Sequence, residues 1–193
     1  NVRFFLGDWG EKFPSDAKLW NGDIIISYNS RWLVPNYLLS KARELAINFH
    51  PGTPKYPGIG CLNFALYEQA HEYGVTCHHM KEKVDTGDII KVTRFPIYKS
   101  DNVESLLLRT YDYQICLYYK IIDLYFNSGV FPKSTENWER KPFTRKDFDE
   151  LNKLRLDMTK DELEKRIRAT VFDKFRPSIV INDIEFRYDD ENL

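Results

Sequence analysis

The sequence predicts an α/β fold, in which a mostly parallel sheet is flanked by helices and is followed by a small carboxyl-terminal helical and β-hairpin extension. Over the first 130 of the 193 residues, short apolar runs typical of buried strands alternate with segments of helical spacing. At residue 131 the composition changes, and prolines and charges interrupt this pattern. Apolar and polar residues then alternate over residues 178–188, which indicates a hairpin. We therefore expect a main domain over residues 1–130 and an extension over residues 131–193.

The expected strands are short runs of apolar residues, many of them β-branched or aromatic. They lie at residues 2–6, 23–28, 46–49, 75–80 and 89–95. Two helices are expected between them. One should follow Pro35 over residues 36–45, and apolar residues at helical spacing predict another over residues 60–73, ended by Gly74.

The longest helix is expected after the last of these strands. It should cover residues 102–127, with Asp101 as its N-cap and Gly129 beyond its end. In the extension, Thr144 and Thr159 each predict the start of a helix, because a threonine hydroxyl can accept a hydrogen bond from the first turn.

Composition and charge indicate a packed globular protein. Hydrophobic residues make up 42% of the chain and aromatic residues 15%. The net charge of −1 provides no basic field for a nucleic-acid backbone, so we expect no nucleic-acid partner. No apolar run approaches the roughly 20 residues of a membrane span, and no signal-like segment opens the chain. We expect a cytoplasmic protein without a membrane partner, in which Cys61, Cys77 and Cys116 are reduced, mostly buried thiols.

The most informative segment is Asn-Phe-His-Pro-Gly, from Asn48 to Gly52. Side chains alternate along a strand, so Asn48 and His50 should emerge on one face while Ile47 and Phe49 occupy the other. The proline that follows has no N–H to donate and ends the strand, and the glycine permits a turn. Ligands of α/β sheets bind at the carboxyl ends of strands, so this is a candidate active site.

Asp85 lies in a turn before the strand at 89–95 and can reach this site. An aspartate there would fix the tautomer of His50 and favour its charged form. Asn48, His50 and Asp85 together suit a reaction in which negative charge develops on a carbonyl oxygen. The chain has no GxSxG elbow and no cysteine in a nucleophile motif, so the attacking group should come from the substrate. The structural alternative is that Asn48 and His50 are ordinary hydrogen-bonded residues at a strand end.

His78 and His79 raise the alternative of a metal site shared with His50. Adjacent strand residues point to opposite faces, so both cannot easily join His50. No HExxH or two-histidine-one-carboxylate spacing is present, and we expect no metal. One of the two histidines should line the pocket while the other packs under a helix.

Three ordered segments carry a resemblance to a known family. They are Ile-Asn-Phe-His-Pro-Gly-Thr-Pro-Lys-Tyr-Pro-Gly-Ile-Gly at 47–60, Gly-Val-Thr-Cys-His at 74–78 and Val-Asp-Thr-Gly-Asp-Ile-Ile at 84–90. Over roughly residues 23–95 the chain resembles the formyltransferases that use N10-formyltetrahydrofolate. That family includes methionyl-tRNA formyltransferase, glycinamide ribonucleotide formyltransferase and the sugar N-formyltransferases. The resemblance implies a Rossmann-like catalytic domain over residues 1–130, short at its amino end.

The resemblance also implies roles for individual residues. The family's catalytic Asn, His and Asp fall on Asn48, His50 and Asp85, and its pocket histidine falls on His78. Residues 27–35 match the loop whose backbone cradles the folate, which implies cofactor contacts from Arg31, Trp32, Leu33 and Val34. In the implied mechanism a neutral amine attacks the formyl carbon, Asn48 and His50 stabilise the tetrahedral oxyanion, and Asp85 orients His50 and helps to move protons.

The loop after His50 points to one branch of the family. The common Ser-Leu-Leu-Pro is replaced by Gly-Thr-Pro-Lys-Tyr-Pro-Gly, and this variant is most similar to enzymes that formylate amino sugars carried on nucleoside diphosphates. The implied substrate is a dTDP-amino-dideoxysugar, a building block of surface polysaccharides such as lipopolysaccharide O-antigen. Tyr56 and Asn63 are the implied sugar contacts. A loop-anchoring tyrosine and a helix-capping asparagine are their structural alternatives.

Other functions stay open at this point. A glycinamide ribonucleotide formyltransferase or a formyltetrahydrofolate hydrolase would keep the same three residues, whereas the near-neutral charge argues against a tRNA substrate. Trp9, Trp20, Trp32 and Trp138 suggest a non-catalytic carbohydrate-binding protein, although aromatic residues are more often found in cores and interfaces. The longest helix and the terminal hairpin are candidates for a homodimer interface.

Overall fold

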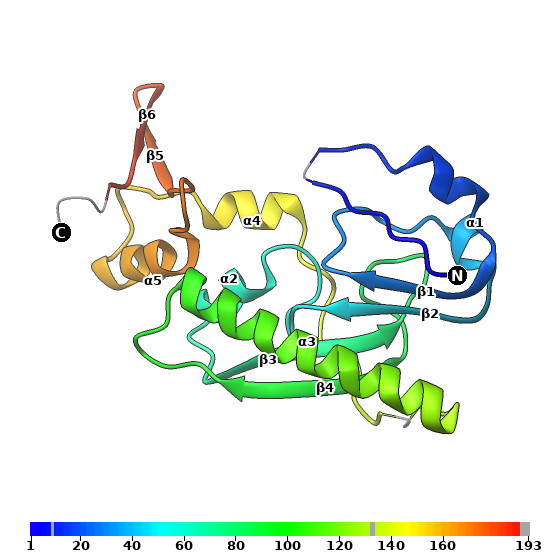
Figure 1. Ribbon diagram of the computed structural model, residues 1–193. Helices are drawn as coiled ribbons and strands as arrows, with labels where there is room; N and C mark the ends of the chain where they lie inside the picture. Colours follow the sequence, from blue (N-terminus) through cyan, green and yellow to red (C-terminus); the bar gives the residue numbers. More distant parts are fainter. Residues whose placement is uncertain (9, 132–133, 190–193) are drawn as a thin grey trace.

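A four-stranded sheet forms the centre of the protein (Figure 1). The computed structural model describes residues 1–8, 10–131 and 134–189, so Trp9 lies outside the described residues. In spatial order the strands are β1 (Gly22–Tyr28), β2 (Ala42–His50), β3 (Glu72–His79) and β4 (Ile89–Pro96). The helix α3 (Val103–Ser128) lies across one face of this sheet. The α/β class predicted from the sequence is confirmed.

The sheet is mixed. β1 and β2 are parallel, as expected, whereas β2 with β3 and β3 with β4 are antiparallel. The turn at residues 80–88 joins β3 directly to β4, and it is too short for the crossover that a parallel pair requires.

Two boundaries near the amino end differ from the sequence prediction. The strand predicted at residues 2–6 is wrong: this segment is irregular, and Val2, Phe4 and Leu6 are 78%, 83% and 91% exposed. An apolar run forms a stable strand only when a neighbouring strand takes up its hydrogen bonds. The predicted helix at 36–45 is also too long, since α1 (Asn36–Leu39) ends before residues 42–45 pair with β1.

The next helix is shorter than predicted for a similar reason. α2 (Cys61–Tyr67) is capped by Glu68, and Gln69 adopts a left-handed backbone with φ of 54°. β3 then begins at Glu72, because the residues that follow pair with β4.

The long helix agrees with the prediction apart from its first cap. Asn102, not Asp101, is the N-cap of α3, and it forms a capping box with Ser105. Asp101 is buried instead and accepts two hydrogen bonds from Arg109. Gly129 ends the helix with φ of 65°, as predicted.

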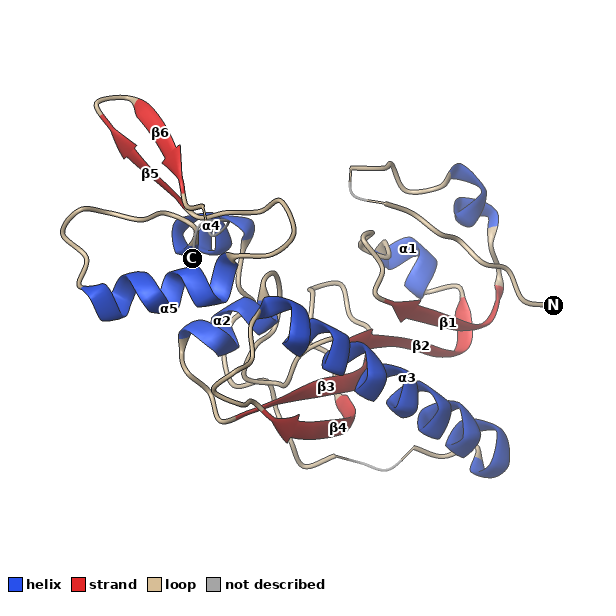
Figure 2. Ribbon diagram, turned by 60° about the vertical axis from the view of Figure 1, so that its left-hand side comes forward, coloured by secondary structure: helices blue, strands red, loops and turns tan. Residues whose placement is uncertain are grey.

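The extension packs against the rest of the chain. It contains α4 (Arg145–Leu151), α5 (Lys160–Thr170) and the hairpin β5 (Ser178–Ile181) and β6 (Ile184–Arg187), which projects from the body (Figure 2). Thr144 and Thr159 cap the two helices, and the predicted hairpin is confirmed. Leu151 and Ala169 join the hydrophobic cluster that includes α2 and the start of α3. The domain boundary at residue 130 stays a prediction, because this cluster is continuous across it. A 3-10 helix (Ser15–Leu19) completes the elements described.

Candidate active site

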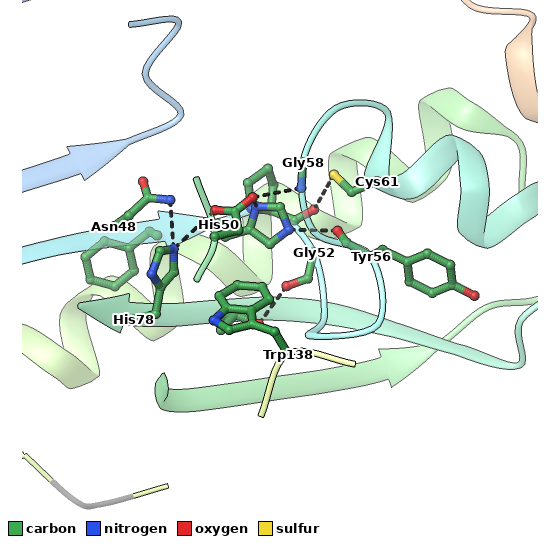
Figure 3. Close-up of polar contacts among 12 residues, drawn as sticks. Asn48, His50, Gly52, Tyr56, Gly58, Cys61, His78 and Trp138 are labelled. Carbon is green, nitrogen blue, oxygen red and sulfur yellow. Dashed lines mark hydrogen bonds and ion pairs between the residues drawn. The ribbon is translucent and has the colours of Figure 1, made fainter. Parts of the chain in front are cut away.

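The carboxyl end of β2 places Asn48 and His50 on the sheet face opposite α3 (Figure 3). Ile47 and Phe49 alternate with them and are buried in the cluster that contains Leu117 of α3. The alternation predicted from the sequence is therefore present.

His50 has a partner at each ring nitrogen. Its Nε2 donates to the carbonyl oxygen of Tyr56 at 2.9 Å, and its Nδ1 lies 3.3 Å from Oδ2 of Asp85. Both partners are acceptors, so the doubly protonated ring satisfies both contacts. A Cβ at Gly52 would lie 2.5 Å from His50 Nε2, which is why the turn needs glycine there.

Asp85 lies between two imidazoles and is 5% exposed. Its Oδ2 accepts from the N–H of Gly58 at 2.8 Å, and its Oδ1 lies 3.3 Å from Nε2 of His78. Burial acts to raise the pKa of Asp85, but the charge of His50 and the hydrogen bonds from His78 and Gly58 outweigh it and lower that pKa to about 2. The group is a carboxylate in neutral solution. Its backbone has φ of 47°, a left-handed conformation that is uncommon for a residue other than glycine.

Asn48 completes the cluster through His78. The Nδ2 of Asn48 is 3.2 Å from Nε2 of His78, and Nδ1 of His78 donates to the carbonyl oxygen of His79 at 2.8 Å. His79 points elsewhere, and its ring lies 6.3 Å from that of Phe131. In the described part of the chain, no group of three or more His, Cys, Asp or Glu side chains is arranged to hold a metal ion.

Trp138, from the extension, packs directly against the two histidines (Figure 3). Its ring centroid lies 5.7 Å from that of His50 and 5.0 Å from that of His78, edge to face in both cases. The indole N–H donates to the carbonyl oxygen of Gly87 at 2.8 Å, in the turn that carries Asp85. Sequence reasoning did not connect Trp138 with the candidate catalytic residues, since no local pattern ties it to a strand 90 residues earlier.

The loop expected to hold folate begins beside Asn48. In the parallel pair, Ser27 is opposite Asn48 and Tyr28 is opposite Phe49, so residues 29–35 leave the sheet next to the site. The predicted folate contacts Arg31, Trp32, Leu33 and Val34 all lie in this loop. Arg31 and Leu33 are exposed, whereas the indole N–H of Trp32 donates to the carbonyl oxygen of Glu11.

The predicted sugar contacts have protein partners. Tyr56 is 1% exposed and its hydroxyl donates to Glu68 at 3.0 Å, so it joins the site through its carbonyl group. The Nδ2 of Asn63 donates to the carbonyl oxygen of Ala169 at 2.6 Å. Their contact with sugar stays a prediction.

The arrangement suits stabilisation of a developing anion. An amide, two imidazoles and one carboxylate meet within hydrogen-bonding distance at the end of a strand. The thiol beside this loop, Cys61, donates to the carbonyl oxygen of Pro51, and burial raises its pKa to about 11. It is therefore a poor nucleophile, and the attacking group is expected to belong to a substrate.

Comparison with known proteins gives a family match. The model of the formyl transferase family matches residues 11–122 of this chain. The chain is 30% identical over 127 residues to phosphoribosylglycinamide formyltransferase of Haemophilus influenzae, covering 64% of this chain and 55% of that protein. It is 34% identical over 85 residues to methionyl-tRNA formyltransferase of Listeria welshimeri, covering 44% of this chain and 27% of that protein. The chain thus spans between about a quarter and about half of the length of these two relatives.

Solved structures of similar fold include N-formyltransferases. A 4-N formyltransferase from Francisella tularensis superposes with a TM-score of 0.76 and 24% identity, over 86% of this chain and 69% of that chain. The N-formyltransferase from Helicobacter canadensis, solved with folinic acid and dTDP-3-aminofucose, gives a TM-score of 0.70 and 26% identity. That match covers 87% of this chain and 62% of the other.

Among the helices that the structure describes, none is both long and apolar enough to span a bilayer.

Proposed function

Because the chain belongs to the formyl transferase family, we propose that it transfers a formyl group from N10-formyltetrahydrofolate to the amine of a nucleotide-linked amino sugar. The observation that carries the proposal is the meeting of Asn48, His50 and Asp85 at the carboxyl end of β2. These are the residues on which the family's catalytic Asn, His and Asp fall. We infer a dTDP-linked amino-dideoxysugar as the acceptor, and a surface-polysaccharide precursor as the product.

The chain's own residues would stabilise charge and hold protons in this reaction. When bound, N10-formyltetrahydrofolate supplies an electrophilic formyl carbon. The amide N–H of Asn48 would donate to the oxygen on which negative charge builds up. His50 would contribute its positive charge, since both of its ring nitrogens already have protein partners. Asp85 would keep His50 oriented and help to move the proton that the amine loses, through water, to the folate nitrogen that leaves as its bond to the formyl carbon breaks.

The donor set fits a folate. The loop at residues 29–35 starts beside Asn48, and its residues Arg31 and Leu33 are exposed, so a pterin ring bound here would lie next to the candidate catalytic residues. The indole N–H of Trp32 donates to the carbonyl oxygen of Glu11, and its main-chain N–H and carbonyl group bond with the hydroxyl of Ser30. A folate contact from Trp32 would therefore replace one of these bonds. His78 would line the same pocket, with its Nε2 beside Asn48 and Asp85.

The choice of sugar as acceptor rests on two kinds of support. The loop after His50 is most similar to the sugar enzymes, and similar folds include an enzyme solved with dTDP-3-aminofucose. A second acceptor, glycinamide ribonucleotide, is favoured by the match to the Haemophilus influenzae enzyme, which covers 64% of this chain.

A substrate screen tests the proposal. The 193-residue protein would be incubated with N10-formyltetrahydrofolate and a panel of dTDP-linked amino sugars, with glycinamide ribonucleotide in a parallel arm. We expect one amino sugar to gain the mass of one formyl group. Formylation of glycinamide ribonucleotide alone would reassign the acceptor. Release of formate at the same rate with and without an amine would indicate a hydrolase, and sugar-nucleotide binding without turnover would indicate a binding protein.

A further inference from the structure

Gln114 is a fully buried polar residue on α3, and it contacts the strand that carries the candidate catalytic residues. It is 0% exposed. Its Nε2 donates a hydrogen bond of 2.7 Å to the carbonyl oxygen of Phe49, the residue between Asn48 and His50. Other buried side chains of α3, such as Leu117 and Ile121, meet the sheet through apolar contacts.

The other polar atom of this side chain is unusual. Oε1 of Gln114 is buried and has no hydrogen-bond partner among the described residues. Buried acceptors are nearly always paired, because an unpaired one lowers stability. One helical turn earlier, the buried hydroxyl of Thr110 has a partner, because it donates to the carbonyl oxygen of Leu106. A methionine would fill the volume of Gln114 without an unpaired oxygen, so packing alone does not account for glutamine here.

The hydrogen bond to Phe49 has a direct consequence for the site. It holds the peptide group between Phe49 and His50, and with it the direction in which the imidazole leaves the strand. There is little free space for a change, since His50 Nε2 already lies close to the backbone of Gly52. The side chain of Asn48 is also in close contact, since its Nδ2 lies 3.2 Å from Nε2 of His78. Misplacement of a reacting group by about 1 Å can lower a rate about a hundredfold.

We propose that Gln114 is a positioning residue for formyl transfer. It acts through the carbonyl group of Phe49 to hold Asn48 and His50 in their catalytic orientation, and the unpaired Oε1 is the cost of that contact. The inference rests on the function proposed above.

Three variants separate positioning from stability. Gln114→Met removes both polar atoms at nearly constant volume. It exchanges one unpaired acceptor, Oε1, for at most one other, the carbonyl of Phe49, so we expect the melting temperature to stay within about 2 °C. Gln114→Glu carries a carboxyl group that burial keeps neutral, and its O–H can donate to Phe49. Thr110→Val is the matched control, because it removes a buried polar group that bonds only within its own helix.

The kinetic readout uses N10-formyltetrahydrofolate and dTDP-3-aminofucose, or the amino sugar that the screen selects. For Gln114→Met we expect kcat to fall about tenfold or more, with both KM values within threefold. Gln114→Glu should recover kcat to within about threefold of the wild type, and Thr110→Val should stay within twofold. Unchanged kcat in Gln114→Met would overturn the proposal, as would a loss of kcat that Thr110→Val reproduces.

A second readout does not depend on formyl transfer. In protein labelled with ¹⁵N-histidine, NMR reports the protonation and hydrogen bonding of His50. We expect the His50 resonances to shift in Gln114→Met and not in Thr110→Val. If the wild type transfers no formyl group but this shift occurs, the proposed function fails while the positioning role of Gln114 stands. Unshifted His50 resonances in Gln114→Met would refute that role.

Discussion

His50 meets an acceptor at both ring nitrogens, the carbonyl oxygen of Tyr56 and the carboxylate of Asp85. A neutral imidazole has one N–H, so it can satisfy only one of these contacts. The contacts therefore suit the charged ring, and they leave no ring nitrogen free to take a proton from a substrate. At the scale of single residues, His50 is better suited to stabilise an anion than to act as a general base.

Replacement of Asp85 tests this arrangement. In Asp85→Asn the negative charge between His50 and His78 is lost, although the shape of the side chain is kept. We expect kcat for formyl transfer to fall about 100-fold or more, the size seen when one group of an anion-stabilising site is removed. The matched control is Asp88→Asn in the same turn, which removes an exposed carboxylate paired with Lys81 and should stay within twofold. Near-native turnover of Asp85→Asn would contradict the role given to Asp85.

The lowered pKa of Asp85 also predicts how stability depends on pH. The pKa is about 2 in the folded protein and near 3.8 in the unfolded chain, so folding is favoured by the ionised form. This contribution, about 2 kcal/mol, is complete above the unfolded pKa and is lost as pH falls from about 4 to about 2. Urea unfolding of wild type and Asp85→Asn is to be compared at pH 5 and at successively lower pH, where the histidines stay protonated. The difference should shrink below pH 4, and a constant difference down to pH 3 would argue against the shift.

Replacement of Tyr56 tests whether this residue contacts the sugar or has a structural role. Its ring is buried and its hydroxyl donates to Glu68, which also accepts from Arg140. Tyr56→Phe keeps the carbonyl that His50 uses and removes only the hydroxyl. We expect the free energy of unfolding to fall by about 1 kcal/mol, with kcat and the sugar KM within twofold. A rise of tenfold or more in the sugar KM at unchanged stability would instead support the predicted sugar contact.

The residues that the sequence identified are those with local signals. The alternation along β2 separates Asn48 and His50 from Ile47 and Phe49, and it is present in the structure. Gln114 carried no comparable signal, because its role depends on how α3 lies on the sheet. Helical periodicity places it among core positions but does not say which carbonyl it reaches.

At the scale of elements, the site is assembled from three connections. The loop at residues 51–60 supplies Tyr56 and Gly58, the turn at 84–88 supplies Asp85, and the segment at 134–143 supplies Trp138. These segments bond to one another: Glu139 N–H donates to the carbonyl oxygen of Pro54, and Phe143 bonds on both sides of Gly58. Rigid loops that support one another are what a preorganised site requires.

Trp138 tests the contribution of the extension to this assembly. Trp138→Ala removes the ring beside His50 and His78 and the hydrogen bond to Gly87, so we expect kcat to fall about tenfold or more. Trp138→Phe keeps ring packing and should lose less. Trp20→Ala is the control, because Trp20 packs on Gly22 away from the cluster and should leave kcat within twofold. If Trp138→Ala and wild type have equal kcat, the contact that the extension makes with His50 and His78 is not needed for catalysis.

Element boundaries show where sequence patterns stop being informative. The span of the long helix was predicted within one residue from Asp101 and Gly129, although the residue that caps its start is Asn102, with Ser105. The strand predicted at residues 2–6 and the length of α1 were wrong, because pairing with a neighbouring strand decides both. The antiparallel pairing of β2 with β3 and of β3 with β4 was not predicted for the same reason, since an apolar run does not indicate in which direction its strand pairs.

At the scale of the whole molecule, one hydrophobic cluster joins the two predicted domains. This cluster contains Tyr56, Phe64 and Leu66 together with Leu151 of α4 and Ala169 of α5. The ring of Phe143 stacks on that of Phe64, with 3.7 Å between the ring centroids. The loop that orients His50 therefore rests partly on the extension. Loss of the extension's packing is expected to disturb the site as well as stability.

Arg166 of α5 links α5 to the end of α4 and, through Glu162, to α2, so its replacement tests how the extension is held to the rest of the molecule. It is 8% exposed, and its guanidinium donates to the carbonyl oxygens of Glu150, Leu151 and Lys153. It also pairs with Glu162, which accepts from Tyr67 of α2. Arg166→Met would remove three hydrogen bonds to carbonyl oxygens and the ion pair with a partly buried carboxylate, so we expect the free energy of unfolding to fall by about 3 kcal/mol.

The matched control is Lys160→Met, at the start of the same helix. Lys160 is exposed and pairs with Glu164 at 3.6 Å, a contact worth at most about 0.5 kcal/mol. In urea unfolding, Arg166→Met should also show a single transition, because a cluster shared by both parts makes them unfold together. Two separate transitions, or a loss no larger than that of Lys160→Met, would mean that the extension is stabilised on its own and that the loop at residues 51–60 does not depend on it.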